Sequence, residues 1–165
     1  MTGKHVLVFA GSFVLAGAVL AQASGGEKPK SVSKGGSGGA VVVPDTDQKW
    51  TELSADSPGV QIADLWGDHT KGAFGALIKF PAGFTAPMHT HTSDMKLIVV
   101  SGTLIHGPEG KPETRMGPGS YLKQPGRTYR HTTVCDKASE CEIFVESTGK
   151  FDLKLVDAAK APAKK

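Results

Sequence analysis

The chain has 165 residues, with 19 Lys and Arg against 16 Asp and Glu and a formal net charge of +3. Most of this positive charge lies near the two ends, because residues 41–149 alone carry 10 basic and 13 acidic side chains. The sequence has no stripe of basic residues interleaved with aromatic ones, which argues against nucleic acid as a partner.

The first 23 residues have the pattern of a secretory signal peptide. A short polar start is followed by an apolar run over residues 6–20 and then by the small-residue sequence Ala21-Gln-Ala23. The apolar run is shorter than the ~20 residues that span a bilayer, which favours a signal cleaved after Ala23 over a membrane anchor. We therefore expect a periplasmic or secreted protein with no membrane contact after cleavage.

The remaining chain divides into a linker, a domain and a tail. Residues 24–40 are rich in Gly, Ser and Lys and cannot bury apolar area, which predicts a flexible linker. Residues 157–165 form a basic tail. Residues 41–156 lie between them and are long enough to form one domain with a buried core.

Short apolar stretches separated by Gly and Pro turns fill the domain. We predict strands at residues 60–66, 73–80, 85–90, 95–100, 103–106, 113–116, 120–124, 129–134, 142–146 and 151–155. No helical period of useful length is present. This pattern predicts an all-β antiparallel sandwich or barrel. His69 lies in a turn between the first two strands, where a solvent-facing role is expected.

Cys135 and Cys141 are separated by a short polar segment with apolar residues on either side. We interpret the segment as the turn of a β-hairpin. In an oxidising compartment a pair this close can form a disulfide, which would stabilise the fold by about 2 kcal/mol on a chain-entropy estimate. The alternative is that Cys135 is a thiolate metal ligand.

His89 and His91 are separated by one residue beside a predicted strand. Residues i and i+2 of an extended chain point to the same face. Both imidazoles could therefore reach one metal ion, and neutral imidazole is the commonest protein metal ligand. The alternative is a pair of polar histidines on an exposed strand.

The surrounding residues resemble the cupin family, the small double-sheet β-barrel. Its first motif is usually G-x5-H-x-H-x3-E-x6-G, and the matching positions here are Gly83, His89, His91 and Gly102, with Met95 in place of the glutamate. Its second motif is usually G-x5-P-x-G-x2-H-x3-N, and the corresponding residues are Gly119, Pro125 and His131. His131, the histidine of this second motif, comes one residue later than the usual spacing, and Cys135 occupies the asparagine position.

The resemblance is closer to one branch, the DUF4437-type exported single-domain cupins, which are similar to the cupin domain of the anti-sigma factor ChrR. It rests on the runs Leu65–Asp68, Lys79–Phe84, Val100–Thr103 and Gly119–Pro125. It covers about residues 48–155 and implies a double-stranded β-helix, a jelly-roll-like antiparallel barrel. It also implies a homodimer formed through sheet-edge strands, and residues 41–43 could supply such an edge.

By the same resemblance, His89, His91 and His131 hold a divalent metal ion at the mouth of the barrel. Met95 supplies neither the charge nor the oxygen of the usual glutamate, and this leaves four interpretations open. A three-histidine site could hold Zn²⁺, Fe²⁺ or Ni²⁺. The soft thioether of Met95 could favour copper. Asp94 could bind after a local bulge, or the histidines could line a metal-free polar pocket.

Other side chains are candidates for the pocket. Tyr121 and His106 are the main ones, although His106 precedes a turn and could equally be a surface histidine. Lys123 and Arg130 are further candidates, whereas Lys96 has the opposite strand parity to Met95 and is expected in solvent.

Three classes of function remain. The first is a metal-dependent dioxygenase, decarboxylase or isomerase acting on a small organic acid or phenolic compound. The second is a non-catalytic module that binds or senses a metal or small ligand. The third is a structural barrel. The sequence contains no nucleophile elbow, no Walker loop and no paired carboxylates near the histidines.

Overall fold

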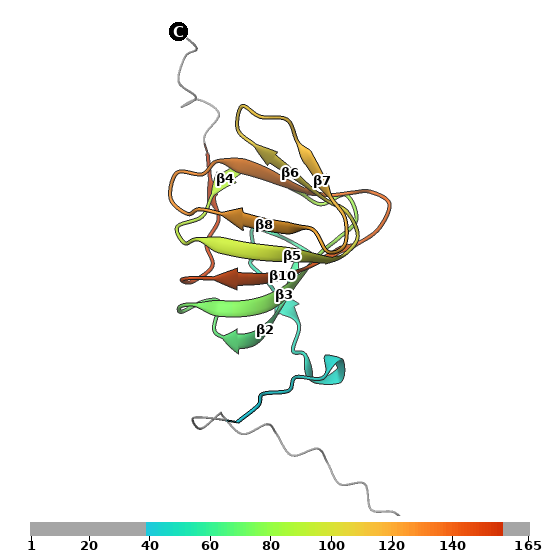
Figure 1. The fold of residues 1–165 in the computed structure, drawn as a ribbon, viewed down its shortest axis with the longest axis vertical. Helices are drawn as coiled ribbons and strands as arrows, with labels where there is room; N and C mark the ends of the chain where they lie inside the picture. The colour runs from blue at the N-terminus through green and yellow to red at the C-terminus, as the bar shows by residue number, and fades with distance from the viewer. Residues whose placement is uncertain (1–38, 157–165) are drawn as a thin grey trace, which may run out of the picture. The chain divides into compact units, whose positions relative to one another are not determined.

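The computed structural model of the protein describes residues 39–156 (Figure 1). The expected signal peptide, nearly all of the expected linker and the expected basic tail lie outside these residues. Within the described range, no helix is long and apolar enough to cross a membrane.

Two antiparallel sheets make up the described fold, which confirms the all-β prediction. Sheet A contains, in spatial order, β1 (Thr51–Glu52), β2 (Gln61–Gly67), β3 (Phe74–Phe80), β10 (Cys141–Ser147), β5 (Met95–Ser101) and β8 (Tyr121–Gln124). Sheet B contains β11 (Lys154–Leu155), β4 (Thr85–Thr90), β9 (His131–Cys135), β6 (Leu104–Pro108) and β7 (Thr114–Met116). A short 3₁₀ turn, η1 (Asp45–Asp47), precedes β1.

The ten expected strands all have counterparts among these eleven. The additional strand β1 has only two residues, too few to show an alternating pattern. Residues 41–43, considered as a dimer edge, form no strand, and Val41 and Val42 are exposed.

The core lies between the two sheets and is built by strand alternation. On β5 of sheet A, Met95, Leu97 and Val99 are buried while the residues between them are exposed. Leu104 and Met116 of sheet B belong to the same hydrophobic cluster. Fully burying a side chain of this size contributes about 1.5–3 kcal/mol, so the alternation fixes which face of each strand turns inward. Figure 1 shows sheet A as a continuous layer from β8 to β2, with β4, β6 and β7 above it.

The expected hairpin around Cys135 and Cys141 is wrong. Strand β9 pairs with β4 and β6 in sheet B, whereas β10 pairs with β3 and β5 in sheet A. The polar segment between the cysteines is therefore a corner where the chain passes from one sheet to the other. A short polar loop between two alternating strands gives the same sequence pattern whether it joins neighbouring strands of one sheet or strands of two different sheets. The two cysteines form a fully buried disulfide that ties the sheets together at this corner.

Candidate metal centre

Three histidines converge inside the barrel: His89 lies in β4, His91 directly follows the end of β4, and His131 begins the neighbouring strand β9. His89 and His91 share a face because they are two residues apart, as the extended backbone requires. The register of β4 and β9 places His131 directly opposite His89, and residues directly opposite in a sheet have close side chains. The exposed fractions of these three residues are only 2%, 8% and 1%, in sequence order. The structure therefore brings the expected set together.

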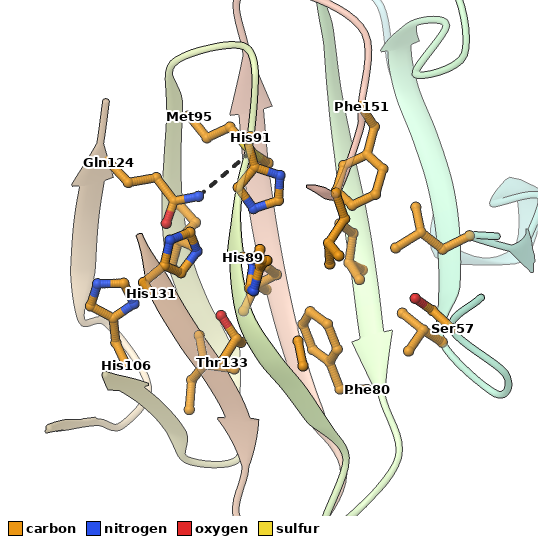
Figure 2. A pocket seen from close by; sticks show the side chains of 18 of the residues that line it. Ser57, Phe80, His89, His91, Met95, His106, Gln124, His131, Thr133 and Phe151 are labelled. Atoms are coloured by element: carbon orange, nitrogen blue, oxygen red, sulfur yellow. Dashed lines mark hydrogen bonds between the residues drawn. The ribbon is translucent and has the colours of Figure 1, made fainter. Parts of the chain in front are cut away.

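The geometry of these histidines suits a metal ion. One ring nitrogen from each lies within 4.8 Å of the others. The ring centroids of His89 and His131 are 4.2 Å apart, and those of His91 and His131 are 5.4 Å apart. Figure 2 shows the three rings gathered at one point of the pocket.

Backbone carbonyls orient all three rings. Nδ1–H of His89 donates to the carbonyl of Pro87 at 2.7 Å, and that of His91 donates to the carbonyl of Asp152. Nδ1 of His131 makes a longer contact of 3.4 Å with the carbonyl of Tyr129. Each Nδ1 is thus engaged, which leaves the Nε2 lone pairs for a metal. Histidine ligands in metalloproteins commonly have their second nitrogen held in this way.

Burial keeps these imidazoles neutral. Burial, with a smaller contribution from the neighbouring histidines, lowers the pKa of His89 to about 4 and that of His131 to about 3. The pKa of His91 is also lowered, mainly by burial. Metal ligands must be deprotonated, so the three side chains are ready to bind at neutral pH. The donor set, its orientation and its protonation state all fit a divalent metal ion.

Met95 and Gln124 close one side of the pocket. They face each other across β5 and β8, and Nε2 of Gln124 donates to Sδ of Met95 at 3.6 Å. Figure 2 shows this bond beside His91. A thioether and an amide, and no carboxylate, therefore lie on this side of the pocket, where the motif resemblance implies a glutamate at position 95. The sequence motifs draw attention to Met95 but contain no signal for Gln124.

His106 is a fourth buried histidine, beside the other three. Its exposed fraction is 5%, and its ring centroid is 5.1 Å from that of His131. The hydroxyl of Tyr129 is hydrogen-bonded to Nε2 of His106 at 2.8 Å. Burial lowers the pKa of His106 and raises that of Tyr129. His106 therefore lines the pocket and is not a surface histidine. The sequence contains no signal for the role of Tyr129 beyond its position two residues before His131.

The cavity beside the histidines is small and uncharged. Its volume is about 60 Å³, and no Asp, Glu, Lys or Arg is among its lining residues within the described chain. Its walls are largely apolar, with Phe80 and Phe151 on the side facing away from His106 (Figure 2). A larger cleft of about 610 Å³ adjoins it, and Phe84, Phe151 and Leu153 line both spaces.

Comparison with known proteins identifies the family. The family described as "Domain of unknown function (DUF4437)" matches residues 40–164. The chain belongs to this family. No curated protein sequence matches it significantly.

Solved structures of similar fold show the fold of this DUF4437 protein. An RmlC-like cupin protein from Ralstonia eutropha JMP134 is 23% identical over 72% of this chain and 74% of its own, with a TM-score of 0.57. The polyketide cyclase RemF from Streptomyces resistomycificus is 18% identical over 74% and 89%, with a TM-score of 0.59. KdgF from Halomonas sp. is 22% identical over 67% and 94%, with a TM-score of 0.53. At these identities the similarity shows the cupin fold.

Asp94 and Tyr121, both candidates for the pocket of this DUF4437 protein, lie elsewhere. Oδ1 of Asp94 accepts from the backbone N–H of Gly126 at 2.8 Å and so supports the loop after β8. Tyr121 is opposite Ile98, on the outer face of sheet A, and is 59% exposed. The reason is strand parity, because Met95 and Gln124 take the inward positions of the same strand pair. Lys123 and Arg130, the further candidates, are also absent from the lining of the cavity.

Of the two interpretations of Cys135, the structure agrees with the disulfide, and Cys135 is not part of the histidine cluster and has no free thiolate to offer. The expectation for His69 changes. His69 is not simply a solvent-facing residue, since its Nδ1 is 2.9 Å from Oδ2 of Asp64 and its side chain is only 14% exposed. His69, Asp64 and Asp68 form a second group of potential ligand atoms, nearer the surface than the histidine cluster.

Proposed function

We propose that this cupin binds a divalent metal ion through His89, His91 and His131 and acts on a small organic molecule in the adjoining cavity. The observation that carries the proposal is the convergence of three neutral imidazoles whose Nδ1 atoms all face backbone carbonyls. A bound divalent ion with open positions supplies Lewis-acid chemistry, which polarises an oxygen of the bound molecule. Three imidazoles suit Zn²⁺, Fe²⁺, Ni²⁺ or copper.

The residues around the histidine triad (His89, His91 and His131) have separate roles in this proposal. Asp152 fixes the ring of His91 through its carbonyl. The apolar walls limit the access of water, which strengthens electrostatic interactions inside the site. His106 lines the cavity beside His131 and is the group placed to take or give a proton, while Tyr129 is hydrogen-bonded to its Nε2. Lyases and cyclases are among the proteins of similar fold, which supports an activity of this general kind.

A second candidate is a non-catalytic module that binds or senses a metal or small ligand. It is favoured by the uncharged lining of the cavity, which offers no carboxylate or amine as a general acid or base. Under this alternative, proton transfer would not occur and the His106–Tyr129 pair would only orient a ligand.

Metal reconstitution tests the proposed function. The full chain is loaded separately with Zn²⁺, Fe²⁺, Ni²⁺ and Cu²⁺, and the bound metal is measured by elemental analysis. We expect one ion per chain in the wild type, loss of that ion in His89→Ala, and retention in His69→Ala, which removes the histidine of the surface group. No metal above background, or equal binding in His89→Ala, would refute the proposal. Turnover screens over phenolic and acid substrates then separate the enzyme from the binding module.

We also propose that the protein is exported. The apolar run and small-residue site in residues 1–23 support a signal peptide. The disulfide between Cys135 and Cys141 supports an oxidising compartment. Fractionation of expressing cells, followed by mass measurement of the mature chain, tests this. A mass that includes residues 1–23 would contradict it.

A further inference from the structure

The charge balance of the cavity points to the chemical class of its ligand. We propose that the open side of the metal site selects an anion, and that the ligand is a small acid with its carboxylate at the histidines and an apolar body toward Phe84 and Phe151. This inference rests on the proposed metal binding and goes further by naming the ligand class.

The first step concerns the charge that the protein supplies. A histidine that donates Nδ1–H and coordinates through Nε2 is a neutral ligand, so the triad adds no negative charge to a divalent ion. No acidic residue lines the cavity within the described chain. A buried cation without a counter-charge is costly, so an anion from outside completes the site.

The second step concerns why the protein's own carboxylates do not fill this role. Met95 and Gln124 close the side of the pocket where a carboxylate would lie, and their contact is a neutral N–H···S bond. The nearby Asp94 and Asp152 are engaged elsewhere, since their carboxylates accept hydrogen bonds from Gly126 and Thr92 respectively. No carboxylate of these residues therefore reaches the triad, and a negative charge at the metal has to come from an external ligand.

The third step concerns the size and polarity of the inner cavity and of the adjoining cleft. The inner cavity of about 60 Å³ exceeds the roughly 10–15 Å³ needed by one water molecule, and has room for a small head group. The adjoining cleft of about 610 Å³ has room for a longer body, although Asp56, Lys150 and Asp152 also line it and its apolar part is the side beside the inner cavity. Phe84, Phe151 and Leu153 lie where the two spaces adjoin, so an apolar chain would contact hydrophobic side chains there.

The test uses Co²⁺ as a spectroscopic probe of the full chain. The Co²⁺-loaded protein is titrated with acetate, hexanoate and the neutral isostere hexanamide, and binding is followed by the visible absorption of cobalt and by calorimetry. We expect hexanoate to bind at least tenfold more tightly than hexanamide, because only the acid is charged. We also expect hexanoate to bind more tightly than acetate, since each additional buried methylene favours binding.

A pair of variants examines the role of Met95 in the same assay. Met95→Glu places a carboxylate beside the triad, so we expect tighter cobalt binding and at least tenfold weaker hexanoate binding. Met95→Gln is the neutral control of matched size and should bind hexanoate like the wild type. If Met95→Glu does not fold, the comparison of acid and amide on the wild type still decides the question.

The outcomes separate the inference from the proposed function. Absence of cobalt binding, or cobalt binding that survives His89→Ala, would overturn both. Cobalt binding at the triad with equal affinity for hexanoate and hexanamide would overturn the anion preference alone. Selective binding of hexanoate that is weakened in Met95→Glu and kept in Met95→Gln would support it.

Discussion

Asp152 holds the edge of the metal centre from two directions, and Asp152→Ala tests how far that support matters. Its carbonyl accepts Nδ1–H of His91, while its carboxylate accepts the N–H of Thr92 at 2.8 Å and the Thr92 hydroxyl. Lys154 lies 3.5 Å from the same carboxylate. The variant keeps the carbonyl but removes the bonds that fix the segment carrying it.

The expected losses follow from these contacts. A hydrogen bond to a charged group contributes about 1.5–3 kcal/mol, and the Asp152 side chain is 22% exposed, which weakens each bond. We therefore expect Asp152→Ala to lower the free energy of unfolding by about 2 kcal/mol. Removing the outer support of a metal ligand costs about 10–100-fold in affinity. Because the His91 acceptor itself remains, we expect Zn²⁺ affinity to fall by about tenfold.

Urea unfolding of the metal-free protein measures the first loss, and competition with a chromophoric chelator measures the second. Asp152→Asn is the matched control, because its amide oxygen can still accept the Thr92 N–H, and intermediate values are expected for it. An unchanged unfolding midpoint together with unchanged Zn²⁺ affinity in Asp152→Ala would refute this account of how His91 is positioned.

Three further predictions concern the disulfide, the buried histidines and Tyr129. Replacing Cys135 and Cys141 together by Ala should lower the free energy of unfolding by about 2 kcal/mol on the loop-entropy estimate, and a variant as stable as the wild type in urea would contradict this. The metal-free protein should lose stability as the pH falls from about 6.5 toward 4. Burial lowers the pKa of His89 to about 4 and that of His131 to about 3 in the folded protein. In this pH range the unfolded chain therefore binds protons that the folded chain does not. Thermal melting at stepped pH measures this, and the slope should flatten when both histidines are replaced by Gln. Tyr129→Phe leaves Nε2 of His106 without its hydrogen-bond partner and should lower the free energy of unfolding by about 1–3 kcal/mol. The variant should still bind one Zn²⁺ per chain. Loss of the metal would contradict this and make Tyr129 part of the metal support.

Local patterns were sufficient for the strands and for two of the three clustered histidines. Alternation along Met95, Leu97 and Val99 predicts an inward face because each strand buries every second residue. The spacing of His89 and His91 predicts a shared face for the same reason. These inferences depend only on residues close together in the sequence, and the structure agrees with them.

The remaining features of the fold and the site depend on pairings between strands that are distant in the sequence. His106 is buried because β6 pairs with β9, which places it opposite Thr133 and close to His131. Gln124 reaches Met95 only through the register of β5 with β8. The hairpin expected at Cys135 failed for a related reason, since the sequence of a short loop does not reveal whether its flanking strands belong to one sheet or two.

The central claim is that His89, His91 and His131 together hold one metal ion, and X-ray absorption spectroscopy of the Zn²⁺-loaded full chain tests it most directly. The account predicts three imidazole nitrogen ligands at about 2.0–2.1 Å, and loss of that signal in His131→Ala. A zinc ion coordinated mainly by oxygen, with a spectrum unchanged in His131→Ala but lost in His69→Ala, would contradict the claim and place the metal at the surface group of Asp64, Asp68 and His69.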